Sequence, residues 1–464
     1  MLFHTATFTL FFTVTFGLFL ALRGEFRKVM LLLASWVFYG WLDWRFLVLM
    51  VGSTSADYCL GLLIERSGND RQRKMTLAFS VAINLLFLSI FKYYDFFAYN
   101  VQAALAQAGF TVHISLLNFA LPVGISFYTF QSMSYVIDVF RREIKATNSF
   151  PDYALFVSFF PHLVAGPIQR ASHLLPQLST LKNTTLPNVV EGAHIFLIGI
   201  FYKVYMADNL AKFVDMVFEA PYADGLSSLL ATYCFGFQIY GDFAGYSLMA
   251  IGAAKILGIN LTDNFRTPYL SSGAVDFWRR WHIALSTWFR DYLYVPLGGN
   301  RVTSSRMFIN LMLVMLLCGL WHGAGWNYIV WGGFHGLLIA LDHFLQRRNI
   351  SAPPFVKWAV WTNLILIGWL FFRAHDIQQA VSMVTALATD FHLSSKWGAS
   401  SFIKALCVYA LPIMVMEYFL LRTNRKYWFE GMSATGRFAG FFGLSVFCLL
   451  FGKFDSRAFI YFAF

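Results

Sequence analysis

Charged residues are scarce in this chain of 464 residues, of which only 13% are Asp, Glu, Lys or Arg. Hydrophobic residues make up 58% of the chain, and its mean hydropathy is +0.58. A soluble globular protein carries about 25% charged residues. The composition therefore excludes a soluble globular domain and predicts a polytopic membrane protein, whose first partner is the lipid bilayer.

The chain also lacks the cysteine and histidine motifs that bind metals or form redox centres. The chain has five cysteines, all within apolar runs, and it contains no CxxC, HExxH or mixed Cys/His cluster. Zinc sites and redox motifs depend on such spacings. We therefore expect no metal site, and we interpret the cysteines as structural. Cys318, one helical turn before His322, has the one position from which a thiol could hold an acyl group.

Internal repeats and low-complexity linkers are also absent, which predicts a single integral membrane domain over residues 1–464. One apolar run, FVSFFPHLVAGPIQR, is interrupted by Pro161, Gly166 and Pro167 and is short for a full crossing. Broken backbone at membrane depth is tolerated where it is buried in protein or lines a cavity. This run is therefore predicted to be a re-entrant segment.

Apolar runs long enough to cross a bilayer, about 20 residues, recur from end to end. They lie near residues 5–22, 29–50, 46–64, 75–97, 117–140, 190–206, 226–258, 307–341, 355–372, 403–421 and 438–452. We predict an all-α transmembrane bundle of roughly 10–12 spans. The first run lacks a basic leader and a cleavage site, so we expect it to be retained as a helix.

The excess of basic residues, a net charge of +11, is distributed unevenly among the loops. The loop ERSGNDRQRK at 65–74 holds four basic residues, whereas the connection 93–117 holds none. Because basic loops stay in the cytoplasm, this alternation predicts an external N-terminus. The positive charge is thus topological, and it gives no reason to expect nucleic acid as a partner.

The stretch DFWRRWHIALSTWFRDYLYVPLGGN, residues 276–300, concentrates three arginines, two aspartates and a histidine among aromatic residues. A charged side chain at the centre of a bilayer costs roughly 2.5–3.5 kcal/mol, so charges at membrane depth indicate function. On a continuous helix, the tryptophans would fall on one face and Arg279, His282 and Arg290 on the other. We therefore expect one helix with two distinct faces.

Two interpretations of this helix stay open. It could be an interfacial amphipathic helix, with tryptophans at the headgroups and arginines reaching toward phosphates. Alternatively, its polar face lines a cavity entered from the cytoplasm. Guanidinium groups bind phosphates with good geometry, so Arg279, Arg280 and Arg290 are then the candidates for binding a phosphorylated donor.

His322, in GLWHGAGW, is the strongest candidate for catalysis. About 14 apolar residues precede it from Met307 onward, and a helix of that length reaches only part-way through a hydrocarbon layer of about 30 Å. Gly323 and Gly325 follow and permit a bend. Imidazole suits proton transfer near neutral pH. The alternative is a buried histidine that bonds a neighbouring helix. His335 could lie in the same cavity.

Several blocks resemble one family, the membrane-bound O-acyltransferases, and within it the bacterial branch that acetylates polysaccharides such as alginate. FYTFQSMSYVIDVFRR, FFPHLVAGPIQR, YGDFAGYSLMAIGAAKILGI, DFWRRWHIALSTWFRDYLYVPLGGNR and LWHGAGWNYIVWGGFHG follow the order of that branch over about residues 121–341. SWVFYGWLDWRFL and the ending FIYFAF are similar too. The family carries a nearly invariant histidine, which corresponds to His322, and an upstream histidine, asparagine or aspartate, which corresponds to His282.

The resemblance implies a helical bundle with a central tunnel in the bacterial inner membrane. It implies that a thioester donor, acetyl-CoA, is used from the cytoplasm, and that His322 and His282 serve the acetyl transfer. It further implies a periplasmic partner resembling SGNH hydrolases, acting with other polysaccharide-biosynthesis proteins on the exported polysaccharide. The polymer could be alginate, cellulose or another exopolysaccharide. A covalent acyl-histidine step stays open.

Two other classes of function compete with this interpretation. In a polysaccharide-export transporter or channel, the segment 276–300 would be a gate for an anionic polymer, but the inverted repeats typical of transporters are not visible. In a scaffold for a periplasmic complex, His322 would be dispensable.

Overall fold

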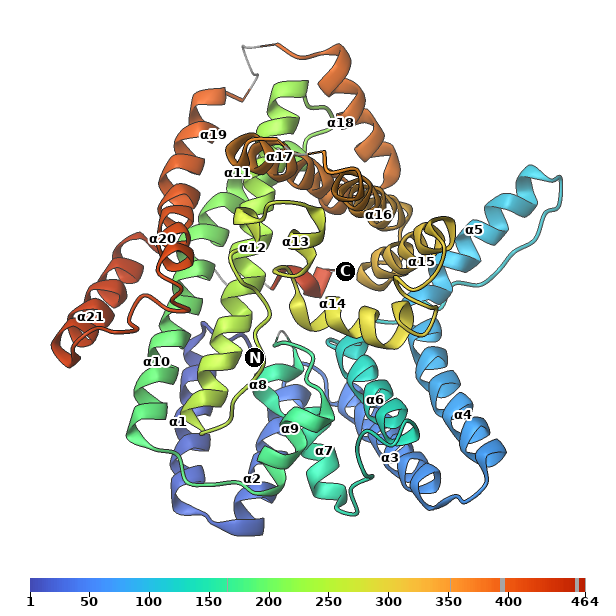
Figure 1. Ribbon diagram of the computed structural model, residues 1–464, viewed down its shortest axis with the longest axis vertical. Helices are drawn as coiled ribbons and strands as arrows, with labels where there is room; N and C mark the ends of the chain where they lie inside the picture. The colour runs from blue at the N-terminus through green and yellow to red at the C-terminus, as the bar shows by residue number, and fades with distance from the viewer. Residues whose placement is uncertain (165, 351, 393–396, 455–458, 464) are drawn as a thin grey trace. The chain divides into compact units, whose positions relative to one another are not determined.

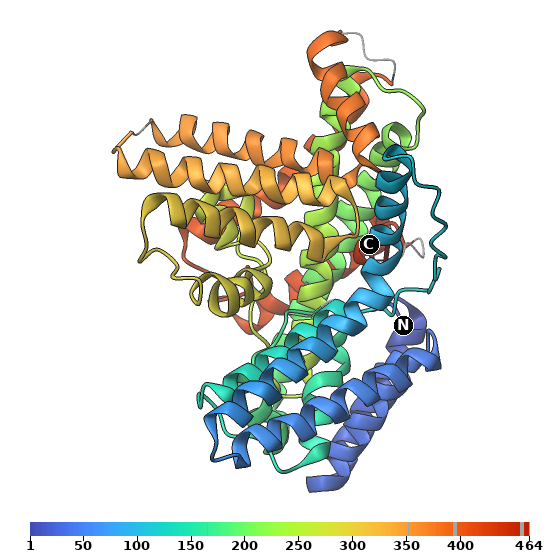
Figure 2. The ribbon, with the colours of Figure 1, turned by 90° about the vertical axis from the view of Figure 1, so that its right-hand side faces the viewer.

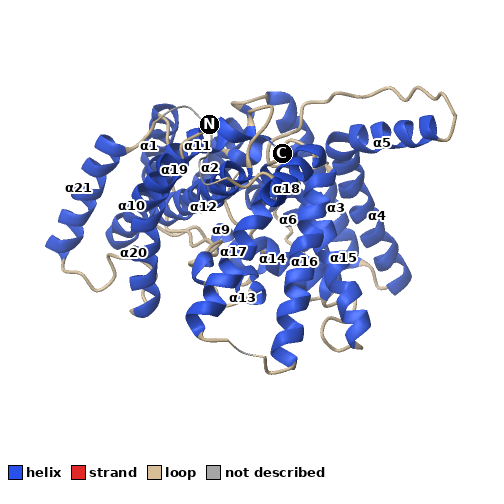
Figure 3. Cartoon of the chain, turned by 90° about the horizontal axis from the view of Figure 1, so that it is seen from above, coloured by secondary structure: helices blue, strands red, loops and turns tan. Residues whose placement is uncertain are grey.

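The computed structural model describes residues 1–164, 166–350, 352–392, 397–454 and 459–463. Over these residues the chain consists of helices and loops, with no β-strand (Figure 3). The prediction of an all-α protein is therefore confirmed. The chain divides into two compact units, one formed by residues 1–192 and 253–262 and the other by residues 193–252 and 263–464.

Unit 1 contains the helices of the first 192 residues (Figure 1). They are α1 (Ala6–Ala21), α2 (Gly24–Gly40), α3 (Trp44–Arg66), α4 (Asp70–Leu88), η1 (Ser89–Tyr93), α5 (Tyr94–Gln107), α6 (Ile125–Phe140), α7 (Phe150–Ser158), α8 (Phe160–Leu163), α9 (Ala171–Ser179) and the start of α10 (Leu186–Ile200). Several of these helices begin at a short polar residue whose side chain caps the first turn. The carboxylate of Asp43 caps α3, and the side-chain oxygen of Asn69 caps α4, each by accepting a backbone N–H.

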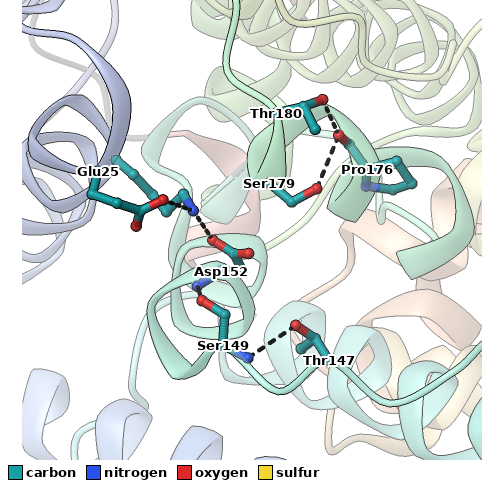
Figure 4. A network of polar contacts seen from close by, with 8 residues as sticks. Glu25, Thr147, Ser149, Asp152, Pro176, Ser179 and Thr180 are labelled. Carbon is teal, nitrogen blue, oxygen red and sulfur yellow. Dashed lines mark hydrogen bonds and ion pairs between the residues drawn. The ribbon is translucent and has the colours of Figure 1, made fainter.

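Buried polar contacts join the helices of unit 1. The ammonium of Lys28 on α2 lies 2.6 Å from the carboxylate of Asp152 on α7, and it also pairs within α2 with the exposed Glu25 at 2.9 Å (Figure 4). The carboxylate of Asp57 on α3 accepts hydrogen bonds from two side chains of α4, Ser80 and Asn84. Such partners are needed because a buried polar group without one is costly.

The interrupted run FVSFFPHLVAGPIQR begins in the last turn of α7 and contains the whole of α8, and the two short helices are separated at Phe159. At 1.5 Å per residue, neither is long enough to cross a bilayer. Phe159, Phe160 and Leu163 are all buried, so this broken backbone is enclosed by protein. Its path relative to the bilayer, as a re-entrant segment, stays a prediction.

Unit 2 begins with the end of α10. It continues with η2 (Phe201–Ala207), α11 (Asp208–Phe218), α12 (Gly225–Ile256, which reaches unit 1 at its end), η3 (Pro268–Leu270), α13 (Ala274–Trp278), α14 (Ile283–Phe289), η4 (Arg290–Tyr294), α15 (Ser304–His322), α16 (Trp326–Arg347), α17 (Pro354–Arg373), α18 (Ile377–Thr389), α19 (Ala399–Ala405), η5 (Leu406–Ala410), α20 (Leu411–Arg422), α21 (Ala434–Phe451) and η6 (Ile460–Ala463). Each candidate site residue of the sequence analysis lies in this unit.

Eight helical segments of the described residues are long and apolar enough to cross a membrane. They are Trp44–Arg66, Asp70–Gln107, Leu186–Phe218, Ser304–His322, Trp326–Arg347, Pro354–Arg373, Ala399–Arg422 and Ala434–Phe451. This makes the chain a multi-pass membrane protein. The predicted spans also included α1, α2 and α6, which have only 16 or 17 residues, and α12, which is long but too polar to meet the same criterion. The predicted central tunnel stays a prediction.

The single apolar run 307–341 forms a hairpin of two helices, α15 and α16, which lie side by side in Figure 2. The bend between them contains Gly323 and Gly325. Glycines also bring the two helices together, because a Cβ on Gly332 would lie 2.2 Å from the carbonyl oxygen of Met315. Small residues at helix contacts allow such close approach in membrane proteins. This hairpin fixes the position of His322.

We expect Gly332→Ala to destabilise unit 2 by about 1–3 kcal/mol, the cost of overpacking, because its methyl group would overlap the backbone of α15. Gly333→Ala is the matched control, since a Cβ there meets only a side-chain carbon of Leu316 at 3.4 Å. Thermal unfolding of the two variants in detergent measures the difference. Equal stability of both variants would contradict close packing of α15 on α16.

Candidate functional site

The segment 276–294 is not one helix, and the prediction of a continuous two-faced helix was wrong. α13 ends at Trp278 and α14 begins at Ile283, with His282 between them in the left-handed region at φ +43°. The turn allows the neighbouring rings of Trp281 and His282 both to be buried. Asn264 stabilises it, since its backbone oxygen accepts the N–H of Ile283 at 2.9 Å.

The three arginines differ from the buried His282 in their exposure and partners. Arg279 and Arg290 are exposed, and Arg290 pairs with the adjacent Asp291 at 2.7 Å. Arg280 is half-buried and pairs with Asp276 at 2.8 Å. Burial raises the pKa of Asp276, but hydrogen bonds led by that from Arg280 outweigh this effect and hold the pKa below its ordinary value. The role of the three arginines in donor binding stays a prediction.

His282 and His322 do come together. Their ring centroids are 6.2 Å apart with an interplanar angle of 49°, and the two side chains are 0% and 3% exposed. His322 is the last residue of α15, and the ring of Tyr328 packs against the adjacent Gly323, where a Cβ would meet it at 2.2 Å. Glycine is therefore required beside His322.

Aromatic rings enclose the two histidines. The ring of His322 lies 5.1 Å from that of Trp331 and 5.3 Å from that of Phe372, while the ring of His282 lies 4.6 Å from that of Phe243. Burial in such surroundings favours the neutral form of the His282 imidazole and lowers its pKa to about 3. A neutral imidazole is the form that can accept a proton.

His335 is fully buried but does not share a wall with His322. The ring of Trp331 lies between them, at 5.1 Å from the ring of His322 and 4.9 Å from that of His335. The structure therefore separates this residue from the pair by one aromatic layer.

Tyr461 is a site residue that sequence reasoning missed. Its ring lies 5.7 Å from that of His322 and 6.4 Å from that of His282. It belongs to the ending FIYFAF, which resembles the family but to which no role was assigned. Its neighbour Ile460 donates its backbone N–H to the carboxylate of Asp242 at 2.7 Å, which ties the C-terminal segment to α12.

Asp242 in turn belongs to a buried ion cluster. The ammonium of Lys203 on η2 lies 2.6 Å from Asp242 and 2.8 Å from Asp208, and all three side chains are at most 4% exposed. A buried charge requires partners of this kind.

A cavity of about 490 Å³, here called the acidic pocket, lies next to the histidines. Tyr328 and Phe459 line it, as do the carboxylates of Asp208, Asp215, Glu219 and Asp242 and the cations Lys203, Arg373 and His375. Arg373 lies 3.2 Å from Asp215 and 2.9 Å from Glu219. Its hydrogen bond lowers the pKa of Glu219.

A second cavity of about 240 Å³, here called the basic pocket, has a different lining. Arg266, Arg425 and Lys426 contribute positive charge, apolar side chains of α10, α12 and α20 form its walls, and Tyr202 and Glu417 also line it. Phe265 is part of the lining, and its ring stacks on that of His282 at 6.5 Å.

The two pockets follow each other along α12. Gln238 and Asp242 line the acidic pocket, and Ser247 and Ile251 line the basic pocket. Phe243, which contacts His282, lies between these two sets. Residues before and after Phe243 on α12 therefore line different pockets. Within the described part of the chain, no three His, Cys, Asp or Glu side chains are grouped as metal ligands.

Comparison with known proteins gives consistent matches. The model of the membrane-bound O-acyltransferase family matches residues 31–375. A probable alginate O-acetylase of Pseudomonas aeruginosa is 40% identical, over 82% of this chain and 73% of its own. A peptidoglycan O-acetyltransferase of Helicobacter pylori is 37% identical, over 78% and 74%. A teichoic acid D-alanyltransferase of Streptococcus thermophilus is 32% identical, over 56% and 69%.

These matches confirm the resemblance on which the sequence analysis relied. The relatives are named as transferases of acetyl or alanyl groups, and the helices of this chain are those of a multi-pass membrane protein. The chain therefore belongs to the membrane-bound O-acyltransferase family and is an acyltransferase.

Proposed function

We propose that this protein O-acetylates an exported polysaccharide, with an acetyl group taken from a cytoplasmic thioester donor, acetyl-CoA. The observation that carries the proposal is the buried pair His282 and His322, whose rings lie 6.2 Å apart in the same unit as two pockets of different charge. Relatives named for alginate and for peptidoglycan O-acetylation support a glycan as the final acceptor. The bacterial inner membrane is the proposed location, since such polymers are exported across it.

The orientation follows from charge. The basic pocket carries Arg266, Arg425 and Lys426, and basic segments stay in the cytoplasm. The acidic pocket lies near His322, at the end of α15 opposite Arg301 and Arg306. We therefore assign the donor to the side of the basic pocket and the acceptor to the side of the acidic pocket.

His322 is proposed as the general base. Its imidazole accepts the proton of the acceptor hydroxyl while that oxygen attacks the thioester carbonyl. The C–S bond then breaks, and the imidazolium returns the proton to the departing sulfur, so that the donor leaves as a thiol. General-base catalysis contributes about 10²–10⁴-fold, and holding both reactants at one imidazole adds the effect of proximity. The aromatic walls exclude water, which limits hydrolysis of the donor. His282 is proposed to support this step from the adjacent position.

The immediate acceptor is proposed to be a periplasmic partner of the SGNH-hydrolase type, which passes the acetyl group to the polymer. The acidic pocket supports this order of transfer, because its four carboxylates outnumber the two cations that pair with them, Lys203 and Arg373, and the remaining negative charge disfavours a polyanion such as alginate. Alginate, cellulose or another glycan can then be the final acceptor.

His322→Ala should lower polysaccharide acetylation by at least about 100-fold, because it removes the general base. The measurement is the acetyl content per sugar of the secreted polymer, taken together with the amount secreted. His113→Ala, in an exposed loop, is the control and should change neither quantity. Normal acetylation in His322→Ala would support a scaffold, and lost secretion with a normal acetyl ratio would support an export channel.

Substitutions at His282 should separate backbone strain from chemistry. Alanine is strained in the left-handed region and glycine is not. The variant His282→Gly should therefore be more stable than His282→Ala by about 1 kcal/mol, although glycine has the smaller side chain. His282→Asn should fold, since Asn tolerates this region, and it should retain more acetylation than either. Thermal unfolding and acetyl content are the readouts. Greater stability of the Ala variant would refute the left-handed turn.

A further inference from the structure

The C-terminal segment reaches the histidine pair through a very short helix. η6 is a single 3₁₀ turn of four residues, and a turn of this length is not stable alone. Phe459 before it is 1% exposed, and the ring of Tyr461 lies 5.7 Å from that of His322. Contacts with the rest of unit 2 must therefore hold this turn in place.

One contact holds the backbone of this turn directly. The Oδ2 atom of Asp242 accepts the N–H of Ile460 at 2.7 Å, while Oδ1 of the same carboxylate lies 2.6 Å from the ammonium of Lys203. A hydrogen bond to a charged acceptor is about twice as strong as one to a neutral acceptor. Asp242 therefore ties Ile460 to α12, and Lys203 compensates the charge that makes this tie strong.

The residue after Lys203 makes a second tie to the C-terminal segment. In η2 the N–H of Asp208 bonds to the carbonyl of Lys203, which is the pattern of a π-helix. The carbonyl of the next residue, Val204, accepts the N–H of Lys453 at 2.9 Å. Adjacent residues of one π-helical turn therefore hold the C-terminal segment, at Lys453 directly and at Ile460 through Asp242.

Stability alone gives little reason for charges at this place. The side chains of Lys203, Asp208 and Asp242 are at most 4% exposed, and the cost of taking such charges out of water can exceed what their pairing returns. Apolar side chains of similar volume often stabilise a fold as well or better. An apolar side chain, however, cannot accept the N–H of Ile460. The carboxylate at position 242 is thus explained by the backbone that it holds.

The position of this backbone matters for the site. Phe459 and Ile460 line the acidic pocket, and the ring of the next residue, Tyr461, contacts those of His322 and His282. A shift of η6 would therefore change a wall of the pocket and the surroundings of the histidine pair together. A misplacement of about 1 Å among reacting groups can lower a rate about 100-fold.

We propose that Asp242 is a positioning residue for the acyl transfer. Through its hydrogen bond with Ile460 it holds Tyr461 against His322, and Lys203 compensates its charge. This inference rests on the role that the proposed function gives to the histidine pair. The position of η6 itself can be measured independently of the reaction.

The test compares Asp242→Leu with Asp208→Leu in the purified full chain in nanodiscs. Each variant removes one carboxylate of the ion cluster and leaves Lys203 with the other, but only Asp242→Leu removes the acceptor of the Ile460 N–H. Amide hydrogen exchange at Ile460 should become about tenfold faster in Asp242→Leu and stay at the wild-type rate in Asp208→Leu. Thermal unfolding checks that both variants are folded.

The second readout is the acetyl content per sugar of the secreted polymer, divided by the amount of the protein in the membrane. It should fall about tenfold in Asp242→Leu and by less in Asp208→Leu. Unchanged exchange in Asp242→Leu, equal exchange in both variants, or faster exchange with normal acetylation would each overturn the inference and leave the proposed function standing. Failure of the proposed function is recognised separately, by normal acetylation in His322→Ala.

A neutral pair of variants keeps the test decisive if a single variant unfolds. Lys203→Met/Asp208→Asn/Asp242→Asn removes all three charges and keeps an oxygen that can accept the N–H of Ile460. The same triple variant with Asp242→Leu lacks that oxygen at similar volume. Neutral replacements of buried ion clusters often retain or raise stability. The Asn version should show slower exchange at Ile460 and more acetylation than the Leu version, and equal values in the two would refute the role of Asp242.

Discussion

The contact between the rings of His282 and His322 constrains much of unit 2. Their centroids lie 6.2 Å apart, and each ring reaches that position from a helix end: the last residue of α15 and the residue before α14. The backbone must therefore break at both places. Glycine provides the break after His322, and a left-handed residue provides it at His282.

This geometry explains which part of the site could be predicted from the sequence. The bend after His322 follows from Gly323 and Gly325, whereas the depth of His322 in the bilayer stays a prediction. The break at His282 could not be seen, because helical periodicity presumes a continuous helix and no Gly or Pro marks the interruption. What breaks this helix is tertiary: the burial of Trp281 beside His282 outweighs the local preference for helix.

In the fold, too, features set by neighbouring residues could be predicted from the sequence, and features set by residues far apart in the chain could not. The long apolar runs predict the helices of α15 to α17 well, since length and hydropathy suffice. Tyr461 and the two pockets were not foreseen, because their residues come from segments far apart in the chain. Tyr461 depends on Asp242, more than 200 positions earlier, to hold the neighbouring backbone. Only the likeness of FIYFAF to the family could have pointed to this residue.

The left-handed turn also accounts for the residues that the family resemblance associates with the position of His282. Histidine, asparagine and aspartate are the side chains that occur most often at positive φ among residues other than glycine. A position restricted to these three is therefore what the backbone would require even without any chemical role. Chemistry at His282 is thus a separate question from its conformation, and a polar side chain that tolerates the turn satisfies the fold. At His322, which ends a regular helix, no such backbone requirement exists, so the conformation of the chain gives no reason for a histidine at this position.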